Sequence, residues 1–345
     1  MEEFILTHTM KAALITHYKQ AFPSIEQVVI PKIGATDVLV KVVAASINPI
    51  DLKTKDGGLK MLLKYNMPLV LGSDFAGIIT QVGEKVTAFN VGDPVYGRVQ
   101  KNRIGTFAEY IAVDHNDIAR KPRNLSFEEA AAIPLVGLTS YQALHDIMKI
   151  KPGQKVLIQA GSGGIGTIAI QIAKMLGAYV TTTTSAKNFA LVKSLGADQV
   201  IDYKTEKFQD KLSDYDYVFD TQGGKILEDA FKIIKPGGKV VSISGLPNAR
   251  FAKEYQLPLW KKLIFALITS RLSALEKAAK AEYIFLFMKP SGAELEILRT
   301  AIEANKIKPV IDRVLPFAAI EEAFRYSKSG RAKGKIILKI NEIAE

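Results

Sequence analysis

Short apolar segments separated by turn residues dominate the chain up to about residue 130. Val, Ile and aromatic residues gather in the segments that we expect to be strands, which are Lys11 to Thr16, Ile25 to Pro31, Asp37 to Ile47, Phe75 to Val82 and Thr106 to Val113. Turn signals such as Asn48-Pro49 lie between them. Because few intervening segments have a helical repeat, the pattern predicts a small barrel-like β domain.

After Pro122 the pattern changes to an alternation of apolar strands and helical segments. Glu128 to Ala132, Thr139 to Met148 and Leu295 to Asn305 have the apolar spacing of helices. The predicted strands are Lys155 to Ala160, Tyr179 to Thr184, Gln199 to Asp202, Tyr217 to Thr221 and Lys239 to Ser244. This alternation predicts a parallel sheet covered by helices. The last apolar segment, Lys335 to Ile340, has no helix after it and could return to the first domain.

The longest apolar region runs from Leu257 to Leu275. Lys261, Lys262 and Arg271 interrupt it, so it does not reach the uninterrupted run of about 18 residues that crosses a bilayer. We predict a helix that is buried or lies in an interface. A helix on a membrane surface is the alternative.

Composition narrows the class of protein. The chain has 345 residues, of which 48% are hydrophobic, enough for two domains with cores. The absence of cysteine excludes disulfides, thiolate zinc sites and a thiol nucleophile. The net charge of +11 favours an anionic partner, which can be nucleic acid, a membrane surface or a phosphorylated small molecule. The segment Met1 to Leu6 carries acids where a leader would carry basic residues, so we expect a cytoplasmic protein.

The most informative segment is a glycine-rich run that follows the predicted strand Lys155 to Ala160. Three of its glycines have the spacing G-x-G-x-x-G, which permits a tight turn, close approach of a pyrophosphate and packing of helix on strand. The apolar residues that follow lie on one face of a helix, and Gly177 comes where that helix should end. The segment therefore predicts a dinucleotide-binding unit whose phosphates meet the helix N-terminus. The predicted contacts are Gly161, Ser162, Gly163, Gly164, Ile165 and Gly166.

The residues after the second strand of this unit indicate which dinucleotide binds. Proteins that bind NAD usually place Asp or Glu about 20 residues after the loop, where it holds the ribose 2′-hydroxyl. Here the segment Thr183 to Asn188 offers hydroxyls and a lysine, and no acid follows before Asp198. Such donors suit a 2′-phosphate, so we predict NADP, with Ser185 and Lys187 as contacts. Ser185 could instead, or also, cap the helix Lys187 to Leu195.

Further motifs fall in order along the chain, and they are Gly72 to Gly77, Val91 to Gly97, Gly105 to Tyr110, Gly137 to Tyr141 and Leu195 to Asp198. Together with the glycine loop, they resemble the medium-chain dehydrogenase/reductase superfamily, particularly its zinc-independent quinone oxidoreductase and enone reductase branch. The resemblance implies an α/β protein with two domains. Residues 1–132 and 290–345 would form a GroES-like, β-rich catalytic domain, and residues 133–289 a Rossmann cofactor domain with a doubly wound parallel sheet.

The sequence departs from the zinc-dependent alcohol dehydrogenases of that superfamily. Those relatives hold catalytic zinc with a cysteine and a Gly-His-Glu motif, whereas the corresponding positions here are Ser46 to Pro49 and Gly72 to Asp74. The four histidines are not spaced like metal ligands, and they are His8, His17, His115 and His145. We therefore expect no metal site, and reduction of an activated double bond or a quinone in place of metal-assisted alcohol oxidation.

Our leading hypothesis is an NADPH-dependent oxidoreductase that reduces α,β-unsaturated carbonyls. Hydride would reach the β-carbon, hydrogen-bond donors would hold the enolate oxygen, and solvent or a tyrosine would protonate the α-carbon. The resemblance places Asn48 and Tyr65 near the substrate, and Lys53 could also donate a hydrogen bond. Alternatively, Asn48 is an ordinary turn residue before a proline, and Tyr65 simply packs.

The resemblance also implies further cofactor contacts. Thr139, Gly245, Phe285 and Phe287 would lie near the nicotinamide, and Tyr203 near the 2′-phosphate. Arg331 and Lys333 would lie near the cofactor or form a solvated basic turn. The segment Tyr283 to Met288 predicts a buried strand, and the resemblance also places it at the contact of a homodimer. We expect neither a nucleic-acid nor a membrane partner.

Two alternative functions stay open. An NADPH:quinone reductase would use the same fold and cofactor. A cofactor-binding protein that interacts with RNA or a membrane, without turnover, is favoured only by the net charge and by the apolar region Leu257 to Leu275.

Overall fold

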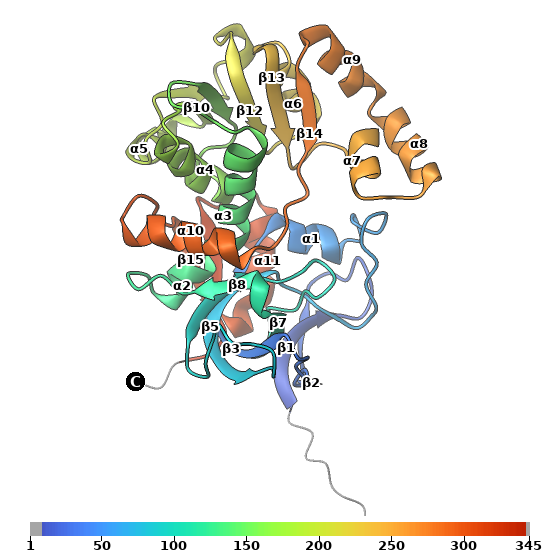
Figure 1. The fold of residues 1–345 in the computed structure, drawn as a ribbon, viewed down its shortest axis with the longest axis vertical. Coiled ribbons are helices and arrows are strands. Elements are labelled where there is room, and N and C mark those ends of the chain that lie inside the picture. Colours follow the sequence, from blue (N-terminus) through green and yellow to red (C-terminus); the bar gives the residue numbers. More distant parts are fainter. Residues whose placement is uncertain (1–8, 343–345) are drawn as a thin grey trace, which may run out of the picture. The chain divides into compact units, whose positions relative to one another are not determined.

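The computed structural model describes residues 9–342 and divides the chain into two compact units. The first unit comprises the residues up to Leu138 and those from Lys289 onward, and the second comprises Thr139–Met288 (Figure 1). The acidic segment Met1 to Leu6 and His8 lie outside the described residues. The N-terminal and C-terminal parts of the sequence thus fold together, and the second unit is inserted between them.

The first unit is built on two sheets. A three-stranded sheet has the order β2-β1-β4, and a seven-stranded sheet has the order β15-β16-β3-β5-β6-β8, with β7 also paired to β3. The strands are β1 Thr9–Ile15, β2 Ser24–Val29, β3 Asp37–Ile47, β4 Leu69–Val70, β5 Asp74–Val82, β6 Pro94–Arg98, β7 Tyr110–Asp114, β8 Ile118–Arg120, β15 Ile311–Pro316 and β16 Lys335–Lys339. The predicted β-rich domain is confirmed.

Strand β16 carries the end of the chain into the centre of the larger sheet. It runs antiparallel to β3, with Ile336 opposite Ile47 and Leu338 opposite Ala45, and parallel to β15 on its other side. Because Ile337 and Leu338 are fully buried, β16 is part of the core. The predicted return of the last apolar segment to the first domain is therefore confirmed.

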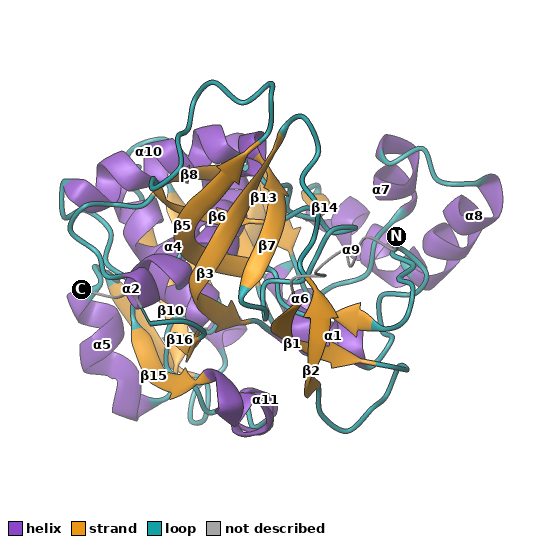
Figure 2. Cartoon of the chain, turned by 90° about the horizontal axis from the view of Figure 1, so that it is seen from below, coloured by secondary structure: helices purple, strands orange, loops and turns teal. Residues whose placement is uncertain are grey.

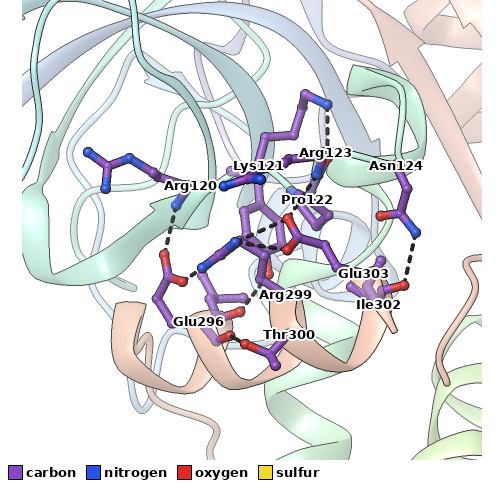
Figure 3. Close-up of polar contacts among 12 residues, drawn as sticks. Arg120, Lys121, Pro122, Arg123, Asn124, Glu296, Arg299, Thr300, Ile302 and Glu303 are labelled. Carbon is purple, nitrogen blue, oxygen red and sulfur yellow. Dashed lines mark hydrogen bonds and ion pairs between the residues drawn. The ribbon is translucent and has the colours of Figure 1, made fainter. Parts of the chain in front are cut away.

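Helices cover parts of these sheets. They are α1 Pro49–Lys55, α2 Phe127–Ala131, α10 Gly292–Glu303 and α11 Ile320–Lys328, and α11 packs against β15 and β16 (Figure 2). Figure 3 shows α10 beside the segment that follows β8. Glu296 accepts from the Arg120 amide at 3.1 Å, and Glu303 accepts from the Arg123 amide at 3.1 Å. Arg299 on the same helix contacts both carboxylates, so α10 is fixed by its acidic side chains.

The second unit is a parallel sheet with the strand order β11-β10-β9-β12-β13-β14. The chain starts in the middle at β9, moves outward to β11, then crosses back and moves outward to β14, which is the doubly wound order. The strands are β9 Lys155–Ile158, β10 Tyr179–Thr184, β11 Gln199–Asp202, β12 Tyr215–Asp220, β13 Ile234–Ser242 and β14 Glu282–Phe285. The helices are α4 Gly164–Met175, α5 Phe189–Ser194, α6 Gly224–Ala230, α7 Ala249–Glu254, α8 Leu259–Ile268 and α9 Ser270–Ala279. Helix α3, Pro134–Tyr141, carries the chain from the first unit into the second.

The region Leu257 to Leu275 is predicted to be a helix that is buried or lies in an interface, and its exposure contradicts the first of these alternatives. It forms α8 and part of α9, and Phe265 is the buried residue of α8. Leu259, Leu263 and Leu267 are 71%, 64% and 74% exposed. An amphipathic helix normally turns its apolar face toward the core, and here that face is turned outward.

We expect Ile337→Ala to lower the free energy of unfolding by about 2–5 kcal/mol, because it leaves a cavity in the core under β16. Urea denaturation, followed by circular dichroism, measures the change. Val314→Ala on the neighbouring β15 is the matched control, since Val314 is 48% exposed and its truncation should cost under about 1 kcal/mol. Equal losses in the two variants would contradict a core position for β16.

Candidate functional site

The glycine loop lies between β9 and α4, at the middle of the doubly wound sheet. Ligands of such sheets bind beyond the carboxyl ends of the strands, where the chain reverses its direction across the sheet. The Gly161 amide donates to the Thr183 carbonyl at 2.9 Å, and the Ala160 amide donates to the Thr183 hydroxyl at 3.1 Å. Ala160 has φ of 52°, a left-handed conformation that is uncommon for alanine. These bonds hold the loop against the end of β10.

Two glycines of the loop are required by close backbone approach. A Cβ at Gly161 would collide with the Thr182 hydroxyl, and a Cβ at Gly166 would collide with the Ala160 carbonyl. Gly163 is the N-cap of α4 and supplies no side-chain hydrogen bond to the helix. The first amides of α4 are therefore left to a ligand, and the helix dipole makes that position favourable for phosphate. The loop fits the pyrophosphate of a dinucleotide.

Side chains around Ser162 connect the loop to the end of β10. The Thr184 hydroxyl lies 2.8 Å from the Ser162 hydroxyl, and the Asn188 amide group donates to the same oxygen at 3.0 Å. Ser185 is the N-cap residue of the following turn, but its side chain makes no capping hydrogen bond. The suggestion that Ser185 caps this helix is therefore wrong. Its hydroxyl lies 3.4 Å from the Asn188 amide nitrogen, which belongs to the same network.

An acidic residue lies beside this network, and the search along the sequence after β10 missed it. Asp202 is paired in register with Thr184, and its carboxylate accepts from the Ala186 amide at 3.2 Å and the Lys204 amide at 3.0 Å. Both carboxylate oxygens are thus engaged by backbone amides. Lys187 and Tyr203 are exposed on the same side of the sheet end, following β10 and β11.

The ends of β12 and β13 form a second polar group in this unit. The Ser242 hydroxyl accepts from the Gly245 amide at 2.7 Å and contacts the buried Asp220 carboxylate. Burial is the main cause that raises the pKa of Asp220. A Cβ at Gly245 would collide with the Tyr283 hydroxyl, so this turn also requires glycine.

The remaining predicted cofactor contacts have separate surroundings. Phe285 and Phe287 belong to an aromatic cluster around Phe251, whose ring centroid lies 5.3 Å and 5.9 Å from theirs. Thr139 is buried at the start of the second unit. Arg331 and Lys333 are exposed in the turn between α11 and β16 of the first unit.

A buried charged cluster occupies the first unit where β3, β5 and β16 meet. The Asp74 carboxylate accepts from the Ser46 hydroxyl at 2.8 Å and from the Asn48 amide group at 3.1 Å. The Lys335 ammonium lies 3.7 Å from Asp74 and donates to the Asn48 side-chain oxygen. Asp51 accepts from the Asn48 backbone amide at 2.8 Å. Asn48 is therefore saturated by partners within this unit.

Burial dominates the electrostatics of this cluster. It raises the pKa of Asp51 to about 7, with the nearby Asp74 adding to the rise and the Asn48 amide opposing it. Burial also raises the pKa of Asp74 and lowers that of Lys335, while their mutual attraction opposes both shifts. Sequence reasoning found Asn48 but missed Lys335, because a lysine at the start of a strand carries no signal of burial.

Tyr65 and Lys53 lie near this cluster in the sequence but differ in exposure. Tyr65 is half-buried, and its hydroxyl donates to the Lys101 carbonyl at 2.7 Å. Burial raises the pKa of Tyr65 to about 12, and it lowers the pKa of the Lys101 ammonium to about 7 with help from Arg98 and Lys289. Lys53 is exposed on α1. Lys101 was not among the predicted residues, since nothing in the sequence marks its burial.

Residues 9–342 contain no group of three or more His, Cys, Asp or Glu side chains that could hold a metal ion. The His145 ring stacks on Tyr141 at 4.6 Å, and His17 is exposed. A catalytic zinc ion needs three such protein ligands, so the described residues do not fit a zinc site.

Comparisons with known proteins agree with the fold. Residues 34–123 match the alcohol dehydrogenase GroES-like domain, and residues 195–338 match the zinc-binding dehydrogenase family. The 2-methylene-furan-3-one reductase of Solanum lycopersicum is 36% identical over 90% of this chain and 74% of its own length. The chloroplastic NADPH-dependent alkenal/one oxidoreductase of Arabidopsis thaliana is 34% identical over the same shares. The structure of the quinone oxidoreductase from Coxiella burnetii superposes with a TM-score of 0.83 and 31% identity, covering 97% of this chain and 100% of that one.

The two units, one GroES-like and one a doubly wound sheet with a glycine loop, define an oxidoreductase fold. With these relatives, the chain belongs to the medium-chain dehydrogenase/reductase superfamily, in its quinone oxidoreductase and enone reductase branch. The family and the fold class predicted from the sequence are confirmed.

We expect Asp51→Asn to remove a pH dependence of stability. Because the pKa of Asp51 is about 7 in the folded chain and about 4 when unfolded, the folded state binds the extra proton between these values. The free energy of unfolding then falls as pH rises from 4 to 7, by at most about 1.4 kcal/mol per pH unit, and is constant above. This pH dependence is absent in Asp51→Asn, because asparagine does not titrate.

Urea denaturation at pH 5, 6, 7 and 8 tests this expectation. The stability of the wild type relative to Asp51→Asn should decrease between pH 5 and 7 and then level off. Asp210→Asn, at an exposed position, should run parallel to the wild type. A constant difference between wild type and Asp51→Asn across this range would show that the pKa of Asp51 is not raised.

Proposed function

We propose that this chain reduces the activated C=C bond of α,β-unsaturated carbonyl compounds with NADPH. The observation that carries the proposal is the glycine loop at the centre of the doubly wound sheet, with uncapped α4 amides beside it. The names of the two plant reductases support the substrate class. When bound, NADPH supplies the hydride that adds to the β-carbon.

The chain's own residues would bind and orient the cofactor. The amides of Gly161 to Gly166 would hold the pyrophosphate, and Ser185, Lys187 and Tyr203 would contact the 2′-phosphate. Both Asp202 oxygens accept from backbone amides, which reduces repulsion between that carboxylate and a phosphate. The other proposed contacts are Thr139, Gly245, Phe285, Phe287, Arg331 and Lys333.

The first unit would supply the groups that act on the substrate. Tyr65 and Lys53 can donate hydrogen bonds to the enolate oxygen, Tyr65 by exchanging the Lys101 carbonyl for substrate as acceptor. Asn48 would be a positioning residue at this site, because its side-chain amide is already hydrogen-bonded to Asp74 and Lys335. The α-carbon would take its proton from Tyr65 or solvent, and Lys101, with a pKa of about 7, is a further candidate donor.

A quinone reductase is the second candidate, and the structure of the Coxiella burnetii protein favours it. It would bind NADPH at the same glycine loop and its substrate at the same first unit. The homodimer and the cytoplasmic location expected from the sequence stay predictions. The edge strand β14 supports the homodimer, because its outer side has no strand partner among the described residues and could pair with another chain.

We expect Lys187→Glu to raise the KM for NADPH by about ten- to a hundredfold and to change the KM for NADH little. The lysine would contact only the 2′-phosphate, and a glutamate there would repel it. Steady-state kinetics with one enone and both cofactors measures the effect. Lys151→Glu is the matched control, because Lys151 is exposed before the opposite end of β9. A wild-type KM for NADH equal to or below that for NADPH would contradict the NADP preference.

A panel of enones, alkenals and quinones separates the two candidate activities. We expect NADPH consumption with enones and alkenals, together with one equivalent of saturated carbonyl product detected by mass spectrometry. Consumption with quinones alone, without any saturated product, would favour the quinone reductase. No turnover with any member, beside salt-sensitive RNA binding, would favour the binding protein without activity.

A further inference from the structure

Helix α8 of the second unit presents an apolar face that the rest of this unit leaves exposed. Leu259, Leu263 and Leu267 form its centre at 71%, 64% and 74% exposure, and Trp260, Ile264 and Ile268 extend it to one side at 55%, 38% and 45%. These positions are spaced as one stripe of a helix. Six large apolar side chains gathered on ten residues are far more than the scattered exposure of an ordinary surface.

The way α8 is attached leaves this stripe outward. Phe265 is the buried residue of the helix, and its ring lies 6.5 Å from that of Phe251 on α7. The Thr269 hydroxyl donates to the Phe265 carbonyl at 2.6 Å, where α8 ends. Phe251 in turn stacks on Tyr255 with centroids 4.4 Å apart. A single aromatic anchor on the polar side of the helix therefore fixes the orientation of the apolar stripe.

The two charged residues of α8 are both lysines. At about 100° per residue, Lys261 and Lys262 fall on its two edges. No acidic residue occurs between Glu254 and Glu276. Basic residues at the edges of an apolar stripe, with a tryptophan in it, are the pattern of helices that lie in the surface of an anionic bilayer.

We propose that α8 docks the protein onto membranes that contain anionic lipid, with its stripe inserted among the acyl chains and its lysines at the headgroups. This inference revises the expectation that the protein has no membrane partner. No helix within residues 9–342 is long and apolar enough to cross a bilayer, so the contact would lie in the membrane plane. It does not depend on the proposed reaction.

The same charges argue against a second copy of this chain as the occupant. In a twofold contact between two α8 faces, each lysine pair meets the same pair of the other copy or lies close to it. Like charges brought together in this way oppose association, and the net charge of +11 adds to the repulsion. An anionic bilayer is complementary to both the stripe and its edges.

Trp260 is the only tryptophan of the chain, so its fluorescence reports directly on this face. The full-length protein is titrated with phosphatidylcholine vesicles, with and without 30% phosphatidylserine. We expect the emission to shift to shorter wavelength with the anionic vesicles, and brominated lipid to quench it. Raising KCl from 0.1 to 0.5 M should weaken binding severalfold. No shift, or equal binding to both kinds of vesicle, would overturn the proposal.

Variants of α8 test whether this helix is responsible for vesicle binding. Leu263→Glu with Leu267→Glu should weaken vesicle binding at least tenfold, and each of Lys261→Gln and Lys262→Gln about fivefold. Ile297→Glu with Val314→Glu is the matched control, at positions of the first unit that are 47% and 48% exposed. It should bind vesicles like the wild type.

Analytical ultracentrifugation without lipid tests whether a second copy of this chain covers the stripe. We expect the mass of the protein to be unchanged by Leu263→Glu with Leu267→Glu, and Trp260 to be accessible to acrylamide in the wild type. The contrary result is a wild-type Trp260 that is shielded without vesicles and becomes accessible when these substitutions dissociate the protein. That result would show that the stripe is a contact between copies, and it would overturn the lipid proposal.

Discussion

The charged cluster of Lys335, Asp74 and Asn48 is the constraint on which the first unit depends. It joins β16, at the end of the chain, to β3 and β5 near its beginning, and it is removed from water. Burial of ions is costly, and it is offset here because the Asp74 carboxylate accepts from Ser46, Asn48 and the Leu135 amide besides its ion pair. Removing one charge would leave the other buried without compensation. The cluster therefore requires that the first unit fold from both ends of the sequence.

The second unit depends on a different constraint, which is close approach of backbone. Gly161 and Gly166 bring the loop against Thr182 and Ala160, and any side chain at either position would force the strand and the helix apart. Gly163, the N-cap of α4, has no side chain to cap the first amides of the helix. Binding of an anion completes what the fold leaves open.

The sequence predicted the elements whose pattern is local. Strands such as β3 and β10 and the helix after the glycine loop follow from apolar spacing and turn residues, and the structure has β3 and β10 with the predicted bounds. The short β4, β6 and β8 were missed, because two to five residues carry little periodicity and each depends on a partner from another segment, β4 on β1, β6 on β5 and β8 on β6. Ser185 was read as a cap from its local position, although its hydroxyl belongs to a network set by tertiary contacts.

The remaining features could not be read from the sequence because they depend on what surrounds a residue. Lys335 and Lys187 are the same residue type at the edge of an element, yet one is fully buried in an ionic cluster and the other is exposed. The apolar run in α8 predicted a helix that is buried or lies in an interface, since hydrophobic spacing shows that a face exists and not which way it turns. Its direction is set by Phe265, one apolar residue on the opposite side. The function of the net charge of +11 likewise depends on where each cation lies, which the sequence alone does not give.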